Sequence, residues 1–405
     1  MKCILIYPPS PYLANDSAYP PSGLLYVAAA MEKLCWEVEI ADLTGGIDWR
    51  KKVSMLQADL FGITCVTPNV GIVGEIAKIV RPKGSQIIVG GIHPTFLPED
   101  TFKNIPCDAV VKGEAELVIK DLLNDVERGV LKKIYEGGLV PVEAIPKPAR
   151  HLIHLDKYTP GEEKTTPIYS SRGCPFDCKF CSRVTGRIYR VLPLGRVLEE
   201  IRDVMALGFK NIVFGDDDIA IQPKRLKEIV KIMLPLGLNF RLNQDARFIE
   251  GETLDLARRA GCREISFGIE SGSQKMLNLM NKKNTVEANK RAILATKDHG
   301  MKAKAYFVVN FPGEDDSTVE ETLKFAEETR PDKWLLSAFA PLPGSDTFTN
   351  PTAYGITWMS SNWEDYYLVG KEGSFKPCFT TEELSTQRQI YLHNKLYNGL
   401  KAILG

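Results

Sequence analysis

The sequence lacks the features that mark several classes of protein. Its 405 residues contain no apolar run of about eighteen residues and no signal-peptide pattern, so we expect no transmembrane segment and a cytoplasmic location. Lysine and arginine (51) balance aspartate and glutamate (51), which argues against a basic surface for nucleic acid. The nine cysteines are an odd number, which argues against a disulfide framework.

Three of the nine cysteines lie together in the stretch SSRGCPFDCKFCS, residues 170–182. Cys174, Cys178 and Cys181 have a CxxxCxxC spacing. Three such thiolates can bind three irons of a 4Fe–4S cluster and leave the fourth iron open. A structural zinc site needs four ligands, and no fourth cysteine or histidine follows at a finger-like distance, so zinc is the weaker alternative.

This stretch resembles the cluster loop of the radical SAM enzymes. It follows an apolar strand, PIYSS, and it carries Phe180 just before the last cysteine. The resemblance implies that the open iron binds S-adenosylmethionine (SAM), and that reductive cleavage of SAM yields a 5′-deoxyadenosyl radical. It also implies an external electron donor such as flavodoxin or ferredoxin.

Residues 1–135 alternate short β-rich apolar runs with helical patterns. The predicted helices lie at about residues 23–33, 48–56, 70–80 and 115–127. This alternation predicts an α/β fold with a Rossmann-like, doubly wound parallel sheet. In such sheets ligands bind at the carboxyl ends of the strands, which is where glycine, proline and hydroxyl residues collect here.

The motifs at those strand ends look like the cobalamin-binding domain that precedes the radical domain in cobalamin-dependent radical SAM enzymes. They are YPPSP, GITCVTPN, GGIHPTFLPED and VVKGEAE, in that order. Any one of them alone would read as turn residues of a parallel sheet. The resemblance implies cobalamin contacts from Pro9, Ser10, Thr64, Thr67, Asn69, Gly90, Gly91, His93, Gly113 and Glu114.

A histidine ligand to cobalt is not indicated in the usual place. Cobalamin domains that use one carry DxHxxG after the first strand, and residues 8–23 contain no histidine. His93 has the right chemistry, but its position after a later strand fits a loop better. We therefore expect the lower face of cobalt to be empty, water-bound or covered by residues 67–69.

The rest of the chain divides into a connector, a second domain and a C-terminal segment. Residues 136–167 contain five prolines and little periodicity, which predicts an extended linker. Residues 168–344 contain six strand-and-helix units, a pattern typical of the partial (β/α)6 barrel of radical SAM enzymes. The predicted helices of this barrel lie at about residues 195–207, 224–236, 253–260, 285–299 and 317–329.

The last segment, residues 345–405, loses the rhythm of a parallel sheet. A helix is predicted at about residues 382–404, with Thr380 or Thr381 as its cap. The aromatic residues before it either line a substrate pocket or form the core of a lid. They are Trp358, Trp363, Tyr366, Tyr367 and Phe375.

The family resemblance also implies SAM contacts at the strand ends of the barrel. By this resemblance, one of Asp216, Asp217 and Asp218 would accept from the methionine ammonium; a solvated acidic turn is the weaker alternative, because three adjacent carboxylates repel one another and need a cation. A guanidinium suits a carboxylate, which makes Arg247 the candidate for the methionine carboxylate. Glu270 and Ser271 would contact the ribose, and Asn310, in NFPGE, would lie beside adenine with Phe180. As isolated residues, the arginine would read as an ion-paired surface group and the asparagine as a turn residue.

These resemblances predict a cobalamin-dependent radical SAM methyltransferase. It would transfer a methyl group from methylcobalamin to an unactivated carbon, or phosphorus, of a small or lipid-like substrate. One alternative is a radical SAM enzyme that catalyses cyclisation, ring contraction or dehydration, with cobalamin in another role or unbound. Another is a zinc-stabilised binding protein without turnover.

Overall fold

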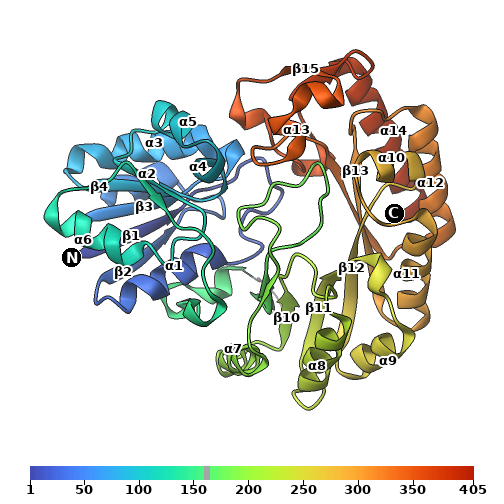
Figure 1. Cartoon of the computed structure of the whole chain (residues 1–405), viewed down its shortest axis with the longest axis horizontal. Coiled ribbons are helices and arrows are strands. Elements are labelled where there is room, and N and C mark those ends of the chain that lie inside the picture. The colour runs from blue at the N-terminus through green and yellow to red at the C-terminus, as the bar shows by residue number, and fades with distance from the viewer. Residues whose placement is uncertain (159–164) are drawn as a thin grey trace. The chain divides into compact units, whose positions relative to one another are not determined.

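The computed structural model describes residues 1–158 and 165–405, and the chain divides into two compact units. The first unit consists of Met1–Pro160, Ser182–Gly186 and Ser361–Tyr366. The second consists of Gly161–Cys181, Arg187–Ser360 and Tyr367–Gly405. Each unit is built on one six-stranded parallel sheet (Figure 1).

The sheet of the first unit has the strand order β2-β1-β3-β4-β5-β6. Its strands are β1 (Lys2–Tyr7), β2 (Glu37–Asp42), β3 (Leu60–Thr64), β4 (Gln86–Gly90), β5 (Ala109–Lys112) and β6 (Ile134–Glu136). The predicted Rossmann-like sheet is confirmed, although β6 is too short for its sequence pattern to indicate it. The strand order reverses between β1 and β3, and open parallel sheets bind ligands at such a switch point.

Helices cover both faces of this sheet because successive strand residues point to opposite sides. Cys3 and Leu5 of β1 pack toward α1 (Ser22–Glu32) and α6 (Ile119–Arg128). Ile4 and Ile6 pack toward α2 (Trp49–Met55) and α3 (Val70–Val80). The result is two apolar cores, one on each face, as a doubly wound sheet requires. Two short helices follow β4, namely α4 (Ile92–Phe96) and α5 (Pro98–Asn104).

The described part of the predicted linker packs against the first unit. Residues 137–158 form three 3-10 turns, Val142–Ala144, Arg150–Leu152 and Leu155–Tyr158. The Ala149 amide donates to the Leu25 carbonyl oxygen at 3.0 Å. At the end of β2, Asp42 accepts from the Tyr158 hydroxyl and pairs with the Lys157 ammonium at 2.8 Å. This segment is therefore anchored at both a helix and a strand end.

The sheet of the second unit has the strand order β14-β13-β12-β11-β10-β7. Its strands are β7 (Thr165–Ile168), β10 (Asn211–Phe214), β11 (Asn239–Gln244), β12 (Cys262–Glu270), β13 (Lys302–Val309) and β14 (Lys333–Ala338). Its crossover helices are α7 (Leu194–Ala206), α8 (Pro223–Met233), α9 (Gly251–Arg259), α10 (Gln274–Leu279), α11 (Val286–Asp298) and α12 (Asp316–Thr329). The six predicted strand-and-helix units are confirmed, and the helices lie along the outer face of the curved sheet (Figure 1).

The amphipathic pattern of the sequence explains this packing. In α7 the buried residues Val197, Ile201 and Val204 recur at intervals of four and three, so they form one apolar stripe. In β11 buried and half-buried residues alternate strictly, as in a strand with one covered face. The helical periodicity of α7 and the strand alternation of β11 thus explain how helices and sheet pack in the barrel.

A small antiparallel sheet closes the cysteine loop. It pairs β8 (Ser171–Arg172) with β9 (Arg190–Val191), and Arg172 lies opposite Arg190. Residues 173–189, which carry all three clustered cysteines, form the loop between the two strands. The loop thus has a fixed base directly after β7.

The C-terminal segment contains α13 (Asp346–Thr349), the antiparallel strands β15 (Ile356–Met359) and β16 (Phe379–Thr381), and α14 (Thr386–Leu404). The predicted cap was wrong: Thr380 and Thr381 lie in β16, where pairing with β15 keeps the backbone extended. Ser385 caps α14 instead, and its hydroxyl oxygen accepts from the Arg388 amide at 3.2 Å. Within the described residues, no helix has the length and apolar character needed to span a membrane.

Candidate active site

The ends of β1 and β3 meet at the switch point of the first sheet. The Asn69 side-chain amide donates to the Ser10 hydroxyl oxygen at 3.1 Å, and Ser10 follows the buried Pro9. Asn69 is buried, and its side-chain carbonyl oxygen has no hydrogen-bond partner among the described residues. A buried acceptor without a donor is costly, so this oxygen is suited to a donor from a ligand.

The ends of β3 and β4 form a backbone cradle. Thr64 lies opposite Gly90 in the register, and Gly91 has a φ of 114°. A Cβ at Gly91 would lie 2.7 Å from the Cys65 carbonyl oxygen and 3.1 Å from the Thr64 hydroxyl oxygen. Only glycine fits there, and its presence keeps the edge of the sheet free of side-chain bulk.

His93 is fully buried beside this cradle. Its Nδ1 lies 3.4 Å from the Thr67 hydroxyl oxygen, and its Nε2 lies 3.1 Å from an Asp100 carboxylate oxygen. The Trp363 indole N–H donates to the same carboxylate at 2.8 Å, and its ring meets the His93 ring edge-on. Burial lowers the pKa of His93, which favours the neutral imidazole. Both ring nitrogens are thus engaged, so His93 holds the loop together, and a bond to cobalt would have to replace one of these contacts.

Gly113 and Glu114 lie one strand further along, at the end of β5. The Gly113 amide donates to the Thr95 hydroxyl oxygen at 3.0 Å, and a Glu114 carboxylate oxygen accepts from the Val140 amide at 2.6 Å. Gly113 has a positive φ of 71°. These two predicted residues therefore shape the loops at this edge, whereas Ser10, Thr64, Asn69 and Gly91 surround the switch point itself.

The three clustered cysteines lie half-buried on a loop that other residues hold in place. All nine cysteines lie in the described ranges, and none forms a disulfide. The Lys179 amide donates to the Met280 carbonyl oxygen at 2.9 Å, and the Asn281 side chain donates to the Asp177 carbonyl oxygen at 2.7 Å. The residues on both sides of Cys178 are therefore fastened to the segment after α10.

A second set of contacts fixes the same loop from α13. The Lys179 ammonium pairs with Asp346 at 3.1 Å and with Asp177 at 3.3 Å. The Thr347 amide donates to the Lys179 carbonyl oxygen at 3.3 Å. The anchors to Met280, Asn281, Asp346 and Thr347 could not be predicted from the sequence, because these residues lie more than a hundred positions from the loop residues that they contact.

Across residues 1–158 and 165–405, no group of three or more cysteine, histidine, aspartate or glutamate side chains is placed to hold a single metal ion. Cysteines of a 4Fe–4S cluster each bind a different iron.

The three adjacent aspartates after β10 have different surroundings. Asp216 is buried and accepts from the Ser170 amide at 3.1 Å, from the Ser170 hydroxyl at 2.8 Å and from the Ser171 hydroxyl. Asp217 is exposed. Asp218 is buried, and one of its carboxylate oxygens has no hydrogen-bond partner in the described part of the chain. Burial raises the pKa of Asp218 to about 6. Asp216 therefore fastens the start of the cysteine loop, and Asp218 is the aspartate that can accept from a ligand.

Arg247 is already engaged by a neighbour. Its Nε and Nη2 donate to the two carboxylate oxygens of Asp245, each at 3.0 Å. The guanidinium lies 4.4 Å from the ring centre of Phe176 and 5.2 Å from that of Phe248. A bidentate pair stacked on aromatic rings is a stable arrangement, so the carboxylate predicted for Arg247 would have to compete with Asp245.

Glu270 and Lys282 form a mostly buried ion pair at the end of β12. Their charged atoms lie 2.7 Å apart, and their side chains are 10% and 13% exposed. A Cβ at Gly268 would lie 2.5 Å from the Glu270 carboxylate and 2.8 Å from the Lys282 ammonium, so this glycine makes room for the pair. Burial lowers the pKa of Lys282, but the negative charges of Glu270 and Cys178 raise it above its usual value. Sequence reasoning missed Lys282, whose only signal was its place twelve residues after Glu270.

Ser271 fastens the strand end to a helix. Its hydroxyl oxygen lies 3.0 Å from that of Thr322 in α12, and it accepts from the Ser273 amide at 3.0 Å. Ser271 is 1% exposed. Its hydrogen bonds are thus made within the protein, and Glu270 is the residue of this pair that carries charge at the edge.

Asn310 and Glu314 form a buried polar pair at the end of β13. The Asn310 backbone amide donates to a Glu314 carboxylate oxygen. Neither polar atom of the Asn310 side chain, nor the second oxygen of Glu314, has a hydrogen-bond partner within the described ranges. Burial raises the pKa of Glu314 to about 8. Glu270 and Asn310 have positive φ values of 61° and 69°, a strained conformation that often marks functional sites.

Comparisons with known proteins agree with this organisation. The model of the radical SAM superfamily matches residues 168–326, and that of the B12 binding domain matches residues 16–123. The chain is 30% identical to an uncharacterized methyltransferase of Pyrococcus horikoshii, over 95% of this chain and 90% of that protein. It is also 30% identical to the bacteriochlorophyllide d C-12(1)-methyltransferase of Chlorobaculum tepidum, over 84% of this chain and 75% of that protein.

A solved structure supports the same fold. The radical SAM methyltransferase TsrM of Kitasatospora setae, solved with tryptophan and a SAM analogue, matches with a TM-score of 0.76 and 17% identity, over 100% of this chain and 89% of that one. The chain belongs to the cobalamin-dependent radical SAM enzymes. The cofactors of this family are a 4Fe–4S cluster, SAM and cobalamin, and the predicted cofactors are confirmed at that level.

Proposed function

We propose that this enzyme transfers a methyl group from methylcobalamin to an unactivated carbon, or phosphorus, of a small or lipid-like substrate by way of a 5′-deoxyadenosyl radical. The observation that carries the proposal is the 30% identity to a methyltransferase across 95% of the chain. A second methyltransferase relative, which acts on a bacteriochlorophyllide, supports the same reaction type. An external reductant such as flavodoxin or ferredoxin supplies the electron.

We assign the SAM site to the carboxyl edge of the second sheet. Cys174, Cys178 and Cys181 hold three irons of the cluster. The oxygen of Asp218 that lacks a partner accepts from the methionine ammonium. Arg247 is the candidate for the methionine carboxylate, which would compete with Asp245 for the guanidinium, and Lys282, paired with Glu270, is a second cation at this edge.

We assign the ribose and the adenine of SAM to the ends of the neighbouring strands, β12 and β13. Glu270 accepts from ribose hydroxyls at the end of β12. Asn310, whose side-chain amide has no hydrogen-bond partner in the described residues, would lie beside adenine at the end of β13, together with Phe180. Ser271 acts indirectly, by fastening β12 to α12.

We assign cobalamin to residues 1–135. Ser10 and Asn69 would provide polar contacts at the switch point. Gly90 and Gly91 have no side chain, so the cofactor could approach the backbone closely between Pro9 and Thr64. With His93 engaged by Thr67 and Asp100, the lower face of a bound cobalamin would be empty, water-bound or covered by residues 67–69. Residues 136–167 connect the two domains, residues 168–344 form the radical domain, and residues 345–405 serve the substrate side.

The proposal can be tested on protein reconstituted without oxygen with iron, sulfide and hydroxocobalamin. Given methyl-labelled SAM and a reductant, the wild-type enzyme should release 5′-deoxyadenosine and place labelled methyl on cobalamin. Replacing Cys174, Cys178 and Cys181 together by alanine should abolish 5′-deoxyadenosine formation. The variant Cys35→Ser, which changes an exposed cysteine outside the triplet, should leave it unchanged.

Two outcomes would overturn different parts of the proposal. Formation of 5′-deoxyadenosine by the triple alanine variant would refute the cluster assignment. Formation of 5′-deoxyadenosine without any labelled cobalamin would refute methyl transfer and favour cyclisation, ring contraction or dehydration.

A further inference from the structure

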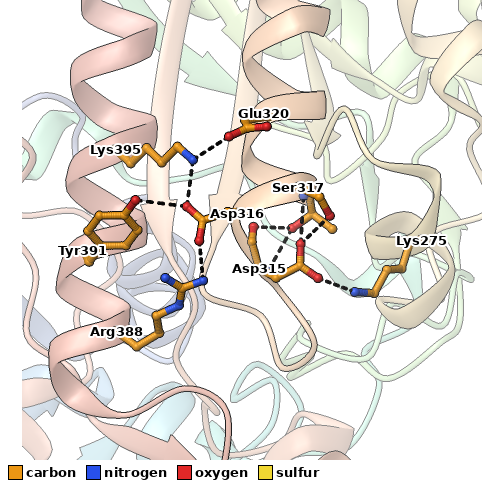
Figure 2. Close-up of polar contacts among 9 residues, drawn as sticks. Lys275, Asp315, Asp316, Ser317, Glu320, Arg388, Tyr391 and Lys395 are labelled. Carbon is orange, nitrogen blue, oxygen red and sulfur yellow. Dashed lines mark hydrogen bonds and ion pairs between the residues drawn. The ribbon is translucent and has the colours of Figure 1, made fainter.

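The C-terminal helix α14 is joined to the first turns of α12 by two carboxylates, those of Asp316 and Glu320, and the Lys395 ammonium pairs with Glu320 at 2.8 Å (Figure 2). Arg388, Tyr391 and Lys395 recur at intervals of three and four, so they lie on one face of α14. All three contact Asp316, the first residue of α12 (Figure 2). The Arg388 guanidinium lies 2.6 Å, the Tyr391 hydroxyl 3.1 Å and the Lys395 ammonium 2.7 Å from its carboxylate oxygens.

The residue before Asp316 is held from the opposite side. Asp315 caps α12, and its carboxylate accepts from the Thr318 amide at 3.1 Å. The Lys275 ammonium of α10 pairs with the same carboxylate at 2.8 Å (Figure 2). Asp315 and Asp316 are therefore fastened to α10 and α14, on either side of the turn that leads into α12.

That turn carries the buried pair of Asn310 and Glu314. Asn310 has a left-handed φ of 69°, and the pair leaves three buried polar side-chain atoms unpaired within the described residues. A strained residue keeps its conformation only where its surroundings over-determine it. A single hydrogen bond between the two residues, from the Asn310 backbone amide to the Glu314 carboxylate, is not enough to hold Asn310 in this conformation. The contacts of Asp315 and Asp316 provide the additional restraint.

We propose that Asp316, together with Arg388 and Lys395 of α14, positions the turn of residues 310–314 for SAM. This inference rests on the proposed function, in which Asn310 lies beside adenine. Asp316, Arg388 and Lys395 are positioning residues, because they act on the turn and do not contact SAM themselves.

A role in stability alone does not explain the network. The side chains of Lys395, Arg388 and Asp316 are 25%, 35% and 39% exposed, and exposed ion pairs contribute little to the free energy of unfolding. Several such ion pairs acting together can restrict the position of the first turn of α12. The expected loss on breaking them therefore falls on SAM binding more than on thermal stability.

The experiment compares three variants with a matched control. Asp316→Asn and the double variant Arg388→Met with Lys395→Met break the network, and Asp316→Glu keeps the carboxylate. The control, Lys290→Met with Glu328→Gln, removes an exposed ion pair of 2.9 Å that joins α11 to the other end of α12. SAM binding is measured by equilibrium dialysis on cluster-reconstituted protein, together with KM and kcat for 5′-deoxyadenosine and the SAM-induced change in the electron paramagnetic resonance spectrum of the reduced cluster.

We expect SAM binding about tenfold weaker in Asp316→Asn and in the Arg388 and Lys395 variant, because small misplacements in a binding site have effects of this order. KM should rise more than kcat falls. Asp316→Glu should regain most of the affinity, and the control should bind SAM as the wild type does.

Each contrary result has a distinct meaning. Wild-type SAM affinity in the broken-network variants would overturn the positioning role. So would a loss of SAM binding that comes with a lower cluster content or a melting temperature well below that of the control, since the network would then serve folding. Failure of the wild-type protein to bind SAM would refute the proposed function instead.

Discussion

The two sheets present very different carboxyl edges. At the first edge both nitrogens of His93, the carboxylate of Glu114 and the hydroxyl of Ser10 are engaged, and the Asn69 side-chain oxygen is the one acceptor described above without a partner in the described residues. At the second edge Asp218 and Glu314 keep buried oxygens without partners in the described residues. A buried ion pair, Glu270 with Lys282, lies beside them.

This difference matches the cofactors of the family. A corrin is large, and it can be bound through shape and backbone contact, for which the cradle at Gly91 is suited. SAM carries an ammonium, a carboxylate and hydroxyls, so its site needs charges and unpaired acceptors. Substitutions at the first edge should therefore act through steric fit, and substitutions at the second should act through charge and pH.

The largest effect is expected from breaking the ion pair at the second edge. Replacing Lys282 by methionine or Glu270 by glutamine leaves one charge buried without its partner, which should lower the free energy of unfolding by about 3 kcal/mol. The double variant should lose less than the two single losses combined, because no uncompensated charge remains. Denaturant unfolding of the apoprotein measures all three, and losses that simply add would contradict a coupled pair.

The next effect tests the steric nature of the first edge with two glycines. Gly91 and Gly84 both have positive φ, but a Cβ at Gly91 meets Cys65 and Thr64, whereas a Cβ at Gly84 meets nothing within 4 Å. Gly84→Ala should lower stability by about 1 kcal/mol through backbone strain alone. Gly91→Ala should lose roughly 2 kcal/mol, and its cobalamin binding should weaken about tenfold, since an added methyl group is felt in a close-packed region. Equal cobalamin affinity in both variants, measured by absorbance titration, would show that the backbone cradle at Gly91 is not part of the cobalamin site.

A pH series separates the two edges directly. Burial raises the pKa of Asp218 to about 6, so below that pH the carboxylate gains a proton and can no longer pair with an ammonium. SAM binding should therefore weaken by up to about tenfold per pH unit below pH 6, as for a single linked proton. Cobalamin binding should show no such step.

The matched variant is Asp218→Asn. It should bind SAM weakly at every pH and remove the step. A step of the same size in this variant, measured by equilibrium dialysis, would assign the proton to another group.

A second pH effect concerns the stability of the apoprotein. Burial raises the pKa of Glu314 to about 8, whereas an unfolded glutamate has a pKa of about 4.3. Between these values the folded chain holds a proton that the unfolded chain has released, so stability is full below about pH 4.3 and falls as the pH rises toward 8. Relative to Glu314→Gln, which cannot ionise, the wild type should lose roughly 3 kcal/mol between pH 5 and pH 8, at about 1.4 kcal/mol per pH unit. Parallel unfolding curves for the two proteins across this range would show that Glu314 ionises normally.

Much of the fold could be predicted because its signals are local. The helix at residues 70–80 was predicted at its observed bounds, and the six strand-and-helix units of the second sheet follow from residues near one another in the sequence. Elements without local periodicity were missed, such as the three-residue strand β6 and the pair of β15 with β16. The start of α14 was misplaced because Thr380 and Thr381 pair with a strand that precedes them by more than twenty residues.

In the site, too, features set by neighbouring residues could be predicted, whereas features set by distant residues could not. The spacing of Cys174, Cys178 and Cys181 and the acidic run after β10 were readable, since each lies within a few residues. Which aspartate is available was not, because Ser170, which occupies Asp216, is 46 residues away from it. The state of His93 depends on Trp363, whose partner Asp100 lies 263 residues from it in the chain.

The sequence by itself determined the class of this enzyme: a cysteine triplet in one repeating α/β pattern, preceded by a second such pattern with glycines and prolines at its strand ends. Only the tertiary structure decided which side chains remain able to bind a ligand. It engaged Arg247 with Asp245, buried His93 and brought Lys282 to Glu270. The physical reason is that residue type and spacing set what a group can bind, whereas its free hydrogen-bonding capacity depends on partners that folding brings from elsewhere in the chain.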